Sequence, residues 1–293
     1  MESLRITEQP LIDETIESYQ FREYEPQNPQ AINNQQAIQI DIHNQDIFTL
    51  PSKSYLYIEG RLQAVSASND AQYKDDTKVI LVNNAMAFLF SQIRYMINNI
   101  EIENIMSPGQ ATTMKGILSY TQSNVEGMNF CWVPDHYNNE HDDNNTGYKD
   151  RHYYLFSLPD PTGSFSFAVP LSHLFGFCED YTKCLYGVKQ SLILSRQGDD
   201  DAIYRKNDVG AGKVTISKLS WFMPHVIPSI DAKLALEKVI SEKTKIPVAF
   251  RALQCDSISV PQSTNFSWRL TVKTGTEKPR FIIVGFQCAP RAS

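Results

Sequence analysis

The chain lacks the features that would place it in a membrane or on a nucleic acid. None of its apolar runs approaches the 18 residues that a membrane-spanning helix needs. Basic residues are the minority, with 27 Lys and Arg against 33 Asp and Glu and a formal net charge of −6. Because a nucleic-acid binder needs a concentrated basic surface, we expect neither a nucleic-acid partner nor a membrane span.

A secretory leader and a set of paired cysteines are also missing. The first residues contain no basic region followed by an apolar stretch. The cysteines are odd in number and stand at no metal-binding spacing: Cys131, Cys178, Cys184, Cys255 and Cys288. We therefore expect free thiols in a reducing compartment, and an intracellular protein.

What the sequence does contain is a series of β-strand patterns. Ile38, Ile40 and Ile42 alternate with polar residues, and residues 54–64 continue with the same period of two. Apolar and aromatic stretches predict further strands at residues 78–82, 88–97, 153–158, 165–170, 185–195, 213–223, 246–260, 266–273 and 280–287. Strands do not alternate with helices, as they would in a parallel sheet. The pattern therefore favours a β-sandwich or jelly roll.

Two local signals interrupt the strands. Asn98-Asn99 lies between two apolar stretches, and because Asn tolerates positive φ, this pair predicts the turn of a hairpin over residues 93–103. Ser107-Pro108 is typical of a helix start, and apolar spacing predicts helices over residues 107–119 and 229–242 as the sizeable ones of the chain.

Composition divides the chain into four parts. Residues 1–35 are polar and are expected to form an extended or partly disordered arm, and residues 197–212 are rich in Gly and Asp and predict a linker. We predict an all-β fold of two tandem antiparallel jelly-roll sandwiches, with short helices inserted in each. The first roll covers residues 36–196 and a partial second roll covers residues 213–293. A jelly roll needs eight strands, and only about four are expected after the linker, so the second roll is predicted to be incomplete, as in a truncated product.

A cluster of possible metal ligands lies in the most polar part of the chain. His136, His141, Asp142, Asp143 and His152 are residue types that bind zinc or non-haem iron. However, the segment predicts no helix or strand that would hold the ligands in place. We interpret it as a solvated loop and expect no metal site there.

Other candidate motifs fail in their context. The stretch Gly210 to Lys213 resembles the end of a phosphate-binding loop, but Asn207 and Val214 replace required residues and a strand follows. Cys178 with His173, and Ser220 with His225, are neighbours in sequence without a nucleophile motif. The Asp199-Asp200-Asp201 run lacks the pattern of a calcium loop and predicts a solvated linker. Aromatic residues Tyr153, Tyr154 and Phe156 could stack on bases but are interpreted as core or interface residues. We predict no catalytic residue, no cofactor-binding residue, no cofactor and no small-molecule substrate.

One region resembles a known family. Residues 165–171, 174–177 and 192–196 resemble the end of the first roll in double jelly-roll major capsid proteins, which occur in large eukaryotic DNA viruses and Polinton-like elements. More broadly, residues 38–287 resemble double jelly-roll-like proteins encoded in invertebrate genomes. Residues 280–287 are similar to a sequence motif of that group.

The resemblance implies a structural, non-enzymatic role. It predicts a viral or virus-derived capsid subunit that assembles as a homotrimer, within a virion if the gene is viral and as an endogenous viral element if it is domesticated. A host β-sandwich module that binds a glycan or a peptide stays open as an alternative. A cupin-like metalloenzyme using His136, His141 and His152 is the third possibility.

Overall fold

The structure is a computed structural model. It describes residues 14–34, 36–43, 46–64, 71–72, 79–121, 125, 128–135, 145–157, 162–205, 212–243, 245–263, 265–269 and 279–286.

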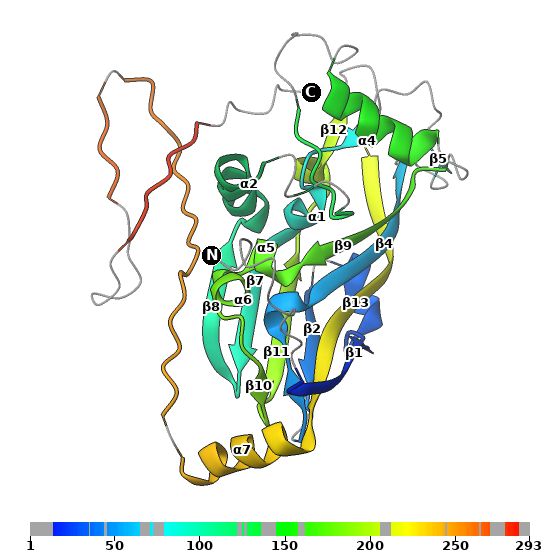
Figure 1. Ribbon diagram of the computed structural model, residues 1–293. Helices are drawn as coiled ribbons and strands as arrows, with labels where there is room; N and C mark the ends of the chain where they lie inside the picture. Colours follow the sequence, from blue (N-terminus) through cyan, green and yellow to red (C-terminus); the bar gives the residue numbers. More distant parts are fainter. Residues whose placement is uncertain are drawn as a thin grey trace, which may run out of the picture.

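Two antiparallel sheets form the body of the molecule (Figure 1). The larger sheet has seven strands: β1 (Ile16–Tyr24), β3 (Phe48–Thr49), β4 (Tyr55–Ala64), β5 (Ala71–Gln72), β9 (Ser164–Pro170), β10 (Leu185–Tyr186) and β13 (Gly212–Pro228). The smaller sheet has the order β2 (Ala37–Ile42), β11 (Gln190–Arg196), β7 (Phe90–Ile97) and β8 (Ile100–Met106). A separate pair joins β6 (Val79–Leu81) to β12 (Ile203–Arg205). The predicted class, mostly antiparallel β structure with a few short helices, is confirmed.

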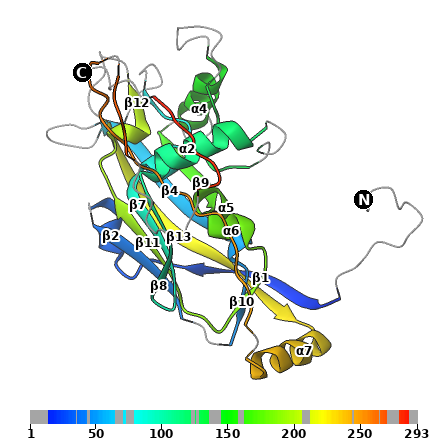
Figure 2. The same cartoon turned by 90° about the vertical axis from the view of Figure 1, so that its left-hand side faces the viewer.

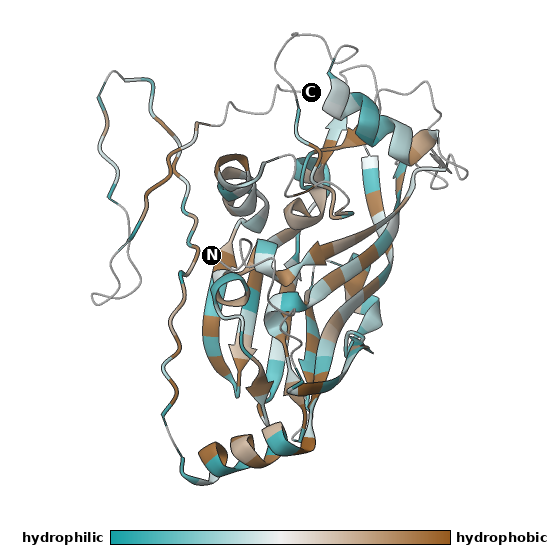
Figure 3. Cartoon of the chain, in the orientation of Figure 1, coloured by the Kyte–Doolittle hydropathy of each residue, from teal (hydrophilic) through white to brown (hydrophobic). Residues whose placement is uncertain are grey.

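The core lies between the two sheets and follows the predicted alternation. Ile38, Ile40 and Ile42 of β2 are buried, as are Leu56 and Ile58 of β4. Along these strands the hydropathy changes from residue to residue (Figure 3). Since successive side chains of a strand point to opposite faces, the period of two places one apolar face of each sheet inside the sandwich.

The predicted hairpin is confirmed in detail. β7 and β8 pair antiparallel, and Ile97 lies opposite Ile100. The two residues between them, Asn98 and Asn99, both have positive φ, at 49° and 64°. This is the backbone that a tight two-residue turn requires and that asparagine tolerates better than other non-glycine residues.

Strand β13 overturns the predicted domain boundary. It pairs with β4 from Gly212 to Phe222, so residues 213–228 are a strand of the first sandwich and their assignment to a second roll is wrong. Arg196 and Asp199 hold the start of this strand. Val214 donates its N–H to Asp199 Oδ2 at 2.8 Å and accepts from Arg196 Nη2 at 3.2 Å. The Gly- and Asp-rich composition marked a connection between strands, since a turn and a domain linker have the same residue preferences.

The N-terminal region contains a strand that the polar composition concealed. Residues 16–24, predicted as part of an arm, form β1 and pair with the C-terminal half of β13, from Tyr24 opposite Trp221 to Ile16 opposite Pro228. Most β1 side chains are exposed. A polar sequence is compatible with an edge strand because main-chain hydrogen bonds, rather than side-chain burial, hold it in place.

Two helices match the prediction and one does not. Helix α2 (Pro108–Ser119) and helix α7 (Ile230–Ser241) lie where the apolar spacing placed them. Helix α4 (Thr146–Phe156) covers residues predicted as a loop and a strand, so that prediction is wrong. Asn145 caps the helix by accepting from the N–H of Tyr148, and Leu155 and Phe156 are buried. Shorter helical segments are α1 (Ala85–Phe88), α5 (Leu171–Leu174), α6 (Gly176–Asp180), η2 (Pro29–Asn33), η3 (Pro51–Lys53) and η5 (Asp200–Ala202).

After helix α7 the described residues contain no strand. Residues 246–260, 266–269 and 280–286 were predicted as strands, but they are extended without ladder partners. The side chains of helix α7 are exposed or half-buried, and Phe281 and Phe286 are 73% and 81% exposed. β-prone sequence becomes a strand only when a neighbour offers its main-chain groups, and no described neighbour does so here.

We predict that limited proteolysis will leave a stable fragment of about residues 14–228. Exposed main chain without ladder bonds is cleaved first, so the early cuts should fall between residues 243 and 286. Mass spectrometry of the fragments checks this. A matched truncation to residues 36–196 lacks β1 and β13 and should not fold. A stable fragment ending near residue 196 would contradict the placement of β13.

Candidate interface beside strand β8

The sequence-predicted metal candidates are not brought together among the described residues. His136, His141, Asp142 and Asp143 lie outside the described residues, and His152 sits on helix α4. Its ring stacks on Tyr148 at 6.2 Å between centroids and contacts Phe156. Within the described part of the chain no group of three or more His, Cys, Asp or Glu side chains could hold a metal. The predicted absence of a metal site stays a prediction.

The nucleophile candidates are engaged in packing. Cys178 is fully buried in helix α6, and burial raises the pKa of its thiol well above the usual range, so the thiolate that a nucleophile needs is disfavoured. His173 contacts two other partners through its ring nitrogens. His225 Nε2 lies 2.8 Å from the hydroxyl of Tyr24, and Ser220 is buried within β13.

The remaining motifs have structural surroundings. Gly212 and Lys213 open strand β13 and not a helix, so they lack the helix N-terminus that receives a phosphate. Asp199, predicted to be part of a solvated linker, instead binds Arg196 and Val214. Of the aromatic trio on helix α4, Phe156 is buried, Tyr154 donates to Ser166 O at 2.8 Å, and Tyr153 is 57% exposed.

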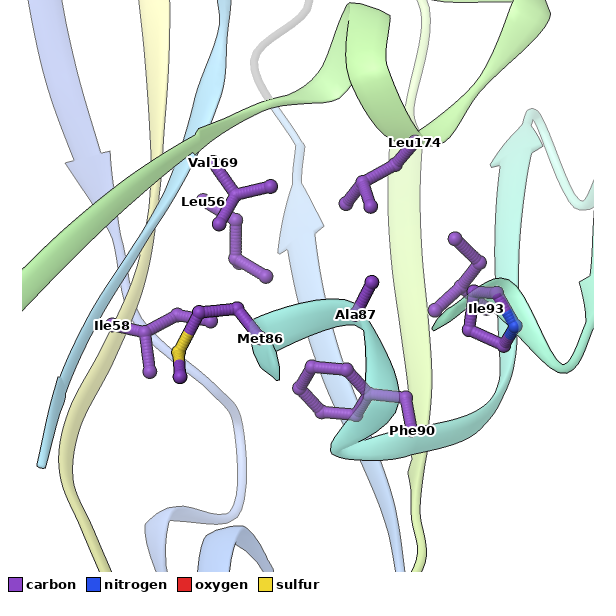
Figure 4. Close-up of a pocket in the computed structure, with 9 residues that line it drawn as sticks. Leu56, Ile58, Met86, Ala87, Phe90, Ile93, Val169 and Leu174 are labelled. Carbon is purple, nitrogen blue, oxygen red and sulfur yellow. The ribbon is translucent and has the colours of Figure 1, made fainter. Parts of the chain in front are cut away.

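A small cavity lies in the core beneath helix α1 (Figure 4). Apolar residues line it: Leu56, Ile58, Met86, Ala87, Phe90, Ile93, Pro108, Val169 and Leu174. A ligand site normally adds convergent polar groups to such a lining. We therefore interpret this cavity as a packing gap.

Among the described residues, no helix is long and apolar enough to cross a membrane.

The most specific polar arrangement is centred on Glu103 of strand β8. This carboxylate is 3% exposed and accepts three main-chain N–H groups. Gly176 donates to Oε1 at 3.1 Å, Phe177 to Oε2 at 2.9 Å, and Leu253 to Oε1 at 2.8 Å. Burial raises the pKa of Glu103, and the three N–H donors lower it in part. One buried side chain thus joins strand β8, helix α6 and a segment 150 residues further along the chain.

An ion pair also holds the same segment. Arg251 forms a forked contact with Asp180, with Nε 2.9 Å from Oδ2 and Nη2 2.5 Å from Oδ1, and its own N–H donates to Oδ2 at 2.8 Å. Hydrogen bonding to Arg251 lowers the pKa of Asp180. Glu179 lies 3.9 Å from Arg251 and 2.7 Å from Lys115 of helix α2. The carboxylates of helix α6 therefore connect the segment to helix α2.

Apolar contacts also hold this segment against the sandwich. We call residues 250–255 the docked segment. The ring of Phe250 meets that of Phe177 edge-on at 5.3 Å, and Leu253 and Cys255 pack on the core. A side chain at Gly176 would coincide with the carbonyl oxygen of Arg251, so only glycine permits this approach. The trace of the docked segment runs beside β8 and α6 in both views (Figures 1 and 2).

A buried polar cluster joins the helices that precede helix α6. His173 of helix α5 is 1% exposed. Its Nδ1 lies 2.9 Å from the hydroxyl of Tyr120, and its Nε2 lies 3.0 Å from Oδ1 of Asn84. Asn84 Nδ2 in turn donates to Thr112 Oγ1 of helix α2 at 2.7 Å. These bonds fasten α1, α2 and α5 together, and burial lowers the pKa of His173 to about 3.

Sequence reasoning missed this interface, although one signal was present. Glu103 interrupts the apolar alternation of strand β8 with a charge on its buried face. An inward-pointing charge on an edge strand is a known device that ends a sheet. Asp180 and Arg251 carry no such signal, because 71 residues separate them and only the tertiary fold brings them together.

We predict that Glu103→Gln will loosen the docked segment. Hydrogen bonds to a charged group contribute about 1.5–3 kcal/mol each, against about 1 kcal/mol for neutral ones. The amide removes the charge from the bonds that Gly176 and Leu253 donate, and it turns an N–H donor towards the N–H of Phe177. The Leu253 amide should therefore exchange with deuterium about ten to a hundred times faster, as measured by NMR. Glu101→Gln, on an exposed position of the same strand, is the matched control and should leave this rate unchanged. Equal rates in both variants would contradict the role of Glu103.

We predict that acid will destabilise the fold through His173. The unfolded pKa is about 6.5 and the folded pKa is about 3. Below pH 6.5 the unfolded chain binds a proton that the folded chain does not, so the free energy of unfolding falls as the pH drops towards 3. The slope contributed by this group approaches about 1.4 kcal/mol per pH unit.

Urea unfolding between pH 4.5 and 7.5 measures the effect of His173. The pH dependence should become shallower in His173→Gln, because that side chain does not titrate. In the wild-type chain the NMR signals of the His173 ring should keep their neutral form down to pH 5. Protonation of this ring in the folded state near pH 6 would contradict the prediction.

Comparison with known proteins identifies the fold. A chain in the cryo-EM structure of the Sputnik virophage aligns with a TM-score of 0.51 at 10% identity, over 79% of this chain and 52% of that chain. The mavirus major capsid protein aligns with a TM-score of 0.46 at 13% identity, over 72% and 47% of the two chains. The PBCV-1 virus capsid gives 0.42 at 11% identity, over 78% and 46%. The chain thus spans about half the length of these solved chains.

No curated protein matches the chain in sequence. A sequence profile does: the family described as double jelly roll-like domain matches residues 79–293, from strand β6 through the docked segment and beyond. This match covers well over half of the 293 residues, and the antiparallel sandwich agrees with it. The chain therefore belongs to the double jelly roll-like domain family.

Proposed function

We propose that the chain is a structural, capsid-like subunit that acts by self-association and carries out no catalysis. Membership of the double jelly roll-like domain family carries this proposal. The fold shared with a chain of the Sputnik virophage structure supports it. In this role the chain acts through its shape. Sandwiches of neighbouring subunits stand side by side and bury surface between them.

The exposed apolar surface is of the kind that association needs. Helix α7 exposes Ile230, Leu234 and Ile240 by 76%, 61% and 45%. The ribbon of this helix, at one end of the sandwich, alternates between apolar and polar residues (Figure 3). Burial of such surface against a neighbouring subunit is the main favourable free energy of assembly.

The proposed assembly is a homotrimer, in which each copy contributes the same surfaces. The intact arrangement requires a second roll, whose strands we expect among residues after helix α7. A virion location, if the gene is viral, belongs to the same proposal.

A binding module is the second candidate, and one observation favours it. Aromatic rings gather on the outer face of the larger sheet, where Tyr55 stacks on Phe222 at 5.1 Å and meets the tilted ring of Phe21 at 5.4 Å. Tyr19 and Phe21 are 42% and 46% exposed. Exposed aromatic surface of this kind can hold a sugar ring or a peptide side chain.

We predict a trimer in solution, which size-exclusion chromatography with light scattering measures directly. The mass should be three times the 33.4 kDa of one chain. Leu234→Asp on helix α7 is expected to shift the trimer towards smaller species, because a charge opposes burial of that surface. Ile100→Asp at the tip of the β7–β8 hairpin is the control, since Ile100 is about equally exposed but lies outside helix α7. A monomer at all concentrations would contradict the proposal and favour the binding module.

A further inference from the structure

The outer face of helix α2 carries apolar side chains with no cover. Ile117 and Leu118 are 64% and 68% exposed, and Met114 is half-buried. Residues at positions i, i+3 and i+4 of a helix share one face, so these three side chains form a single apolar strip. We call it the α2 strip.

A second uncovered segment lies near the C-terminus. Residues 281–286 are extended, and the exposed fractions of Phe281, Ile282, Val284 and Phe286 range from 64% to 81%. The segment is aromatic and β-branched, without charge and without proline. Such a sequence has high β propensity and aggregates when it is left exposed, so it requires a partner.

The strip and the segment already touch. A Cβ atom built on Gly285 would lie 3.0 Å from Sδ and 3.9 Å from Cγ of Met114. The absence of a side chain at Gly285 therefore allows close approach to the helix. Figure 2 shows the C-terminal trace beside helix α2.

This contact continues the interface of the docked segment. Lys115, the neighbour of Met114, donates to the carbonyl of Ser172 at 3.3 Å and pairs with Glu179. Glu179 also lies 3.9 Å from Arg251 of the docked segment. Two parts of the chain after helix α7 thus meet the same side of the sandwich, one at β8 and α6 and the other at α2.

We propose that residues 281–286 of the same chain are the partner of the α2 strip. The segment packs across Met114, Ile117 and Leu118, and Gly285 is the point of closest approach. Together with the docked segment it makes this side of the sandwich an internal interface of the chain. The inference goes beyond the proposed function, because it holds whether or not the chain forms trimers.

The choice of partner follows from continuity and connectivity. The docked segment is held by Glu103 and Asp180 of the same chain, and residues 281–286 follow it after about 25 residues. The tether keeps their local concentration near the strip high, which favours a contact within the chain over one between chains. A face covered in this way is unavailable to a neighbouring subunit.

A disulfide trap tests the contact in the full-length chain. Met114→Cys combined with Gly285→Cys should form a bond within one chain on mild oxidation, identified by peptide mass mapping in the monomer band. Leu234→Cys with Gly285→Cys is the matched control. Leu234 is as exposed as Ile117 but lies on helix α7, at the opposite end of the molecule (Figure 1). The control should yield no bond within the chain.

A charge on the strip gives a second measurement. Leu118→Asp, added to the Met114→Cys and Gly285→Cys pair, should slow bond formation about tenfold, because an aspartate opposes apolar packing. Ile100→Asp in the same background should leave the rate unchanged, since Ile100 is about as exposed as Leu118 but lies outside helix α2. The inference is overturned if the 114–285 bond forms only between chains, if it does not form, or if the two aspartate variants have equal rates. Because the bond is scored within single chains, the result is independent of the oligomeric mass that tests the proposed function.

Discussion

The pairing of strand β13 with β4 and β1 is the constraint on which the rest of the structure depends. Its 17 residues cross the larger sheet and contribute Trp221 and Met223 to the core. Without this strand, β1 would have no ladder partner and the inner face of the smaller sheet would be partly uncovered. Arg196 and Asp199 take both main-chain groups of Val214, so the strand enters the sheet in one register.

The smaller sheet ends at β8 because of a charge. A free edge invites another strand, and Glu103 on β8 instead directs its carboxylate to the main-chain N–H groups of Gly176, Phe177 and Leu253. The docked segment is therefore held by a side chain and not by ladder bonds. This arrangement lets the residues after helix α7 pack beside the sandwich without extending its sheet.

The contrast between the two parts of the chain has one physical origin. Strands of the sandwich have both ladder partners and an apolar face to bury, whereas the stretches after helix α7 have the composition of strands but no described partner. Burial and ladder pairing come together in a sheet, and neither is stable alone. The exposed apolar residues of helix α7 and of residues 281–286 are thus uncovered surfaces of the kind that mark interaction sites.

The sequence by itself determined the class of fold and much of its local structure. Period-two alternation predicted β2 and β4, Asn98-Asn99 predicted the hairpin turn, and helical spacing predicted α2 and α7, because each depends on residues close together in the chain. The tertiary structure alone decided the rest. β1 and β13 meet across about 200 residues, so composition could not reveal their pairing, and Glu103 meets Leu253 across 150. Helix α4 was missed because its buried positions are mixed with polar ones, including Arg151, whose guanidinium is satisfied by Leu81 O and Asp135 only in the folded chain. Local patterns report the preference of a segment, whereas partners distant in sequence determine whether that preference is realised.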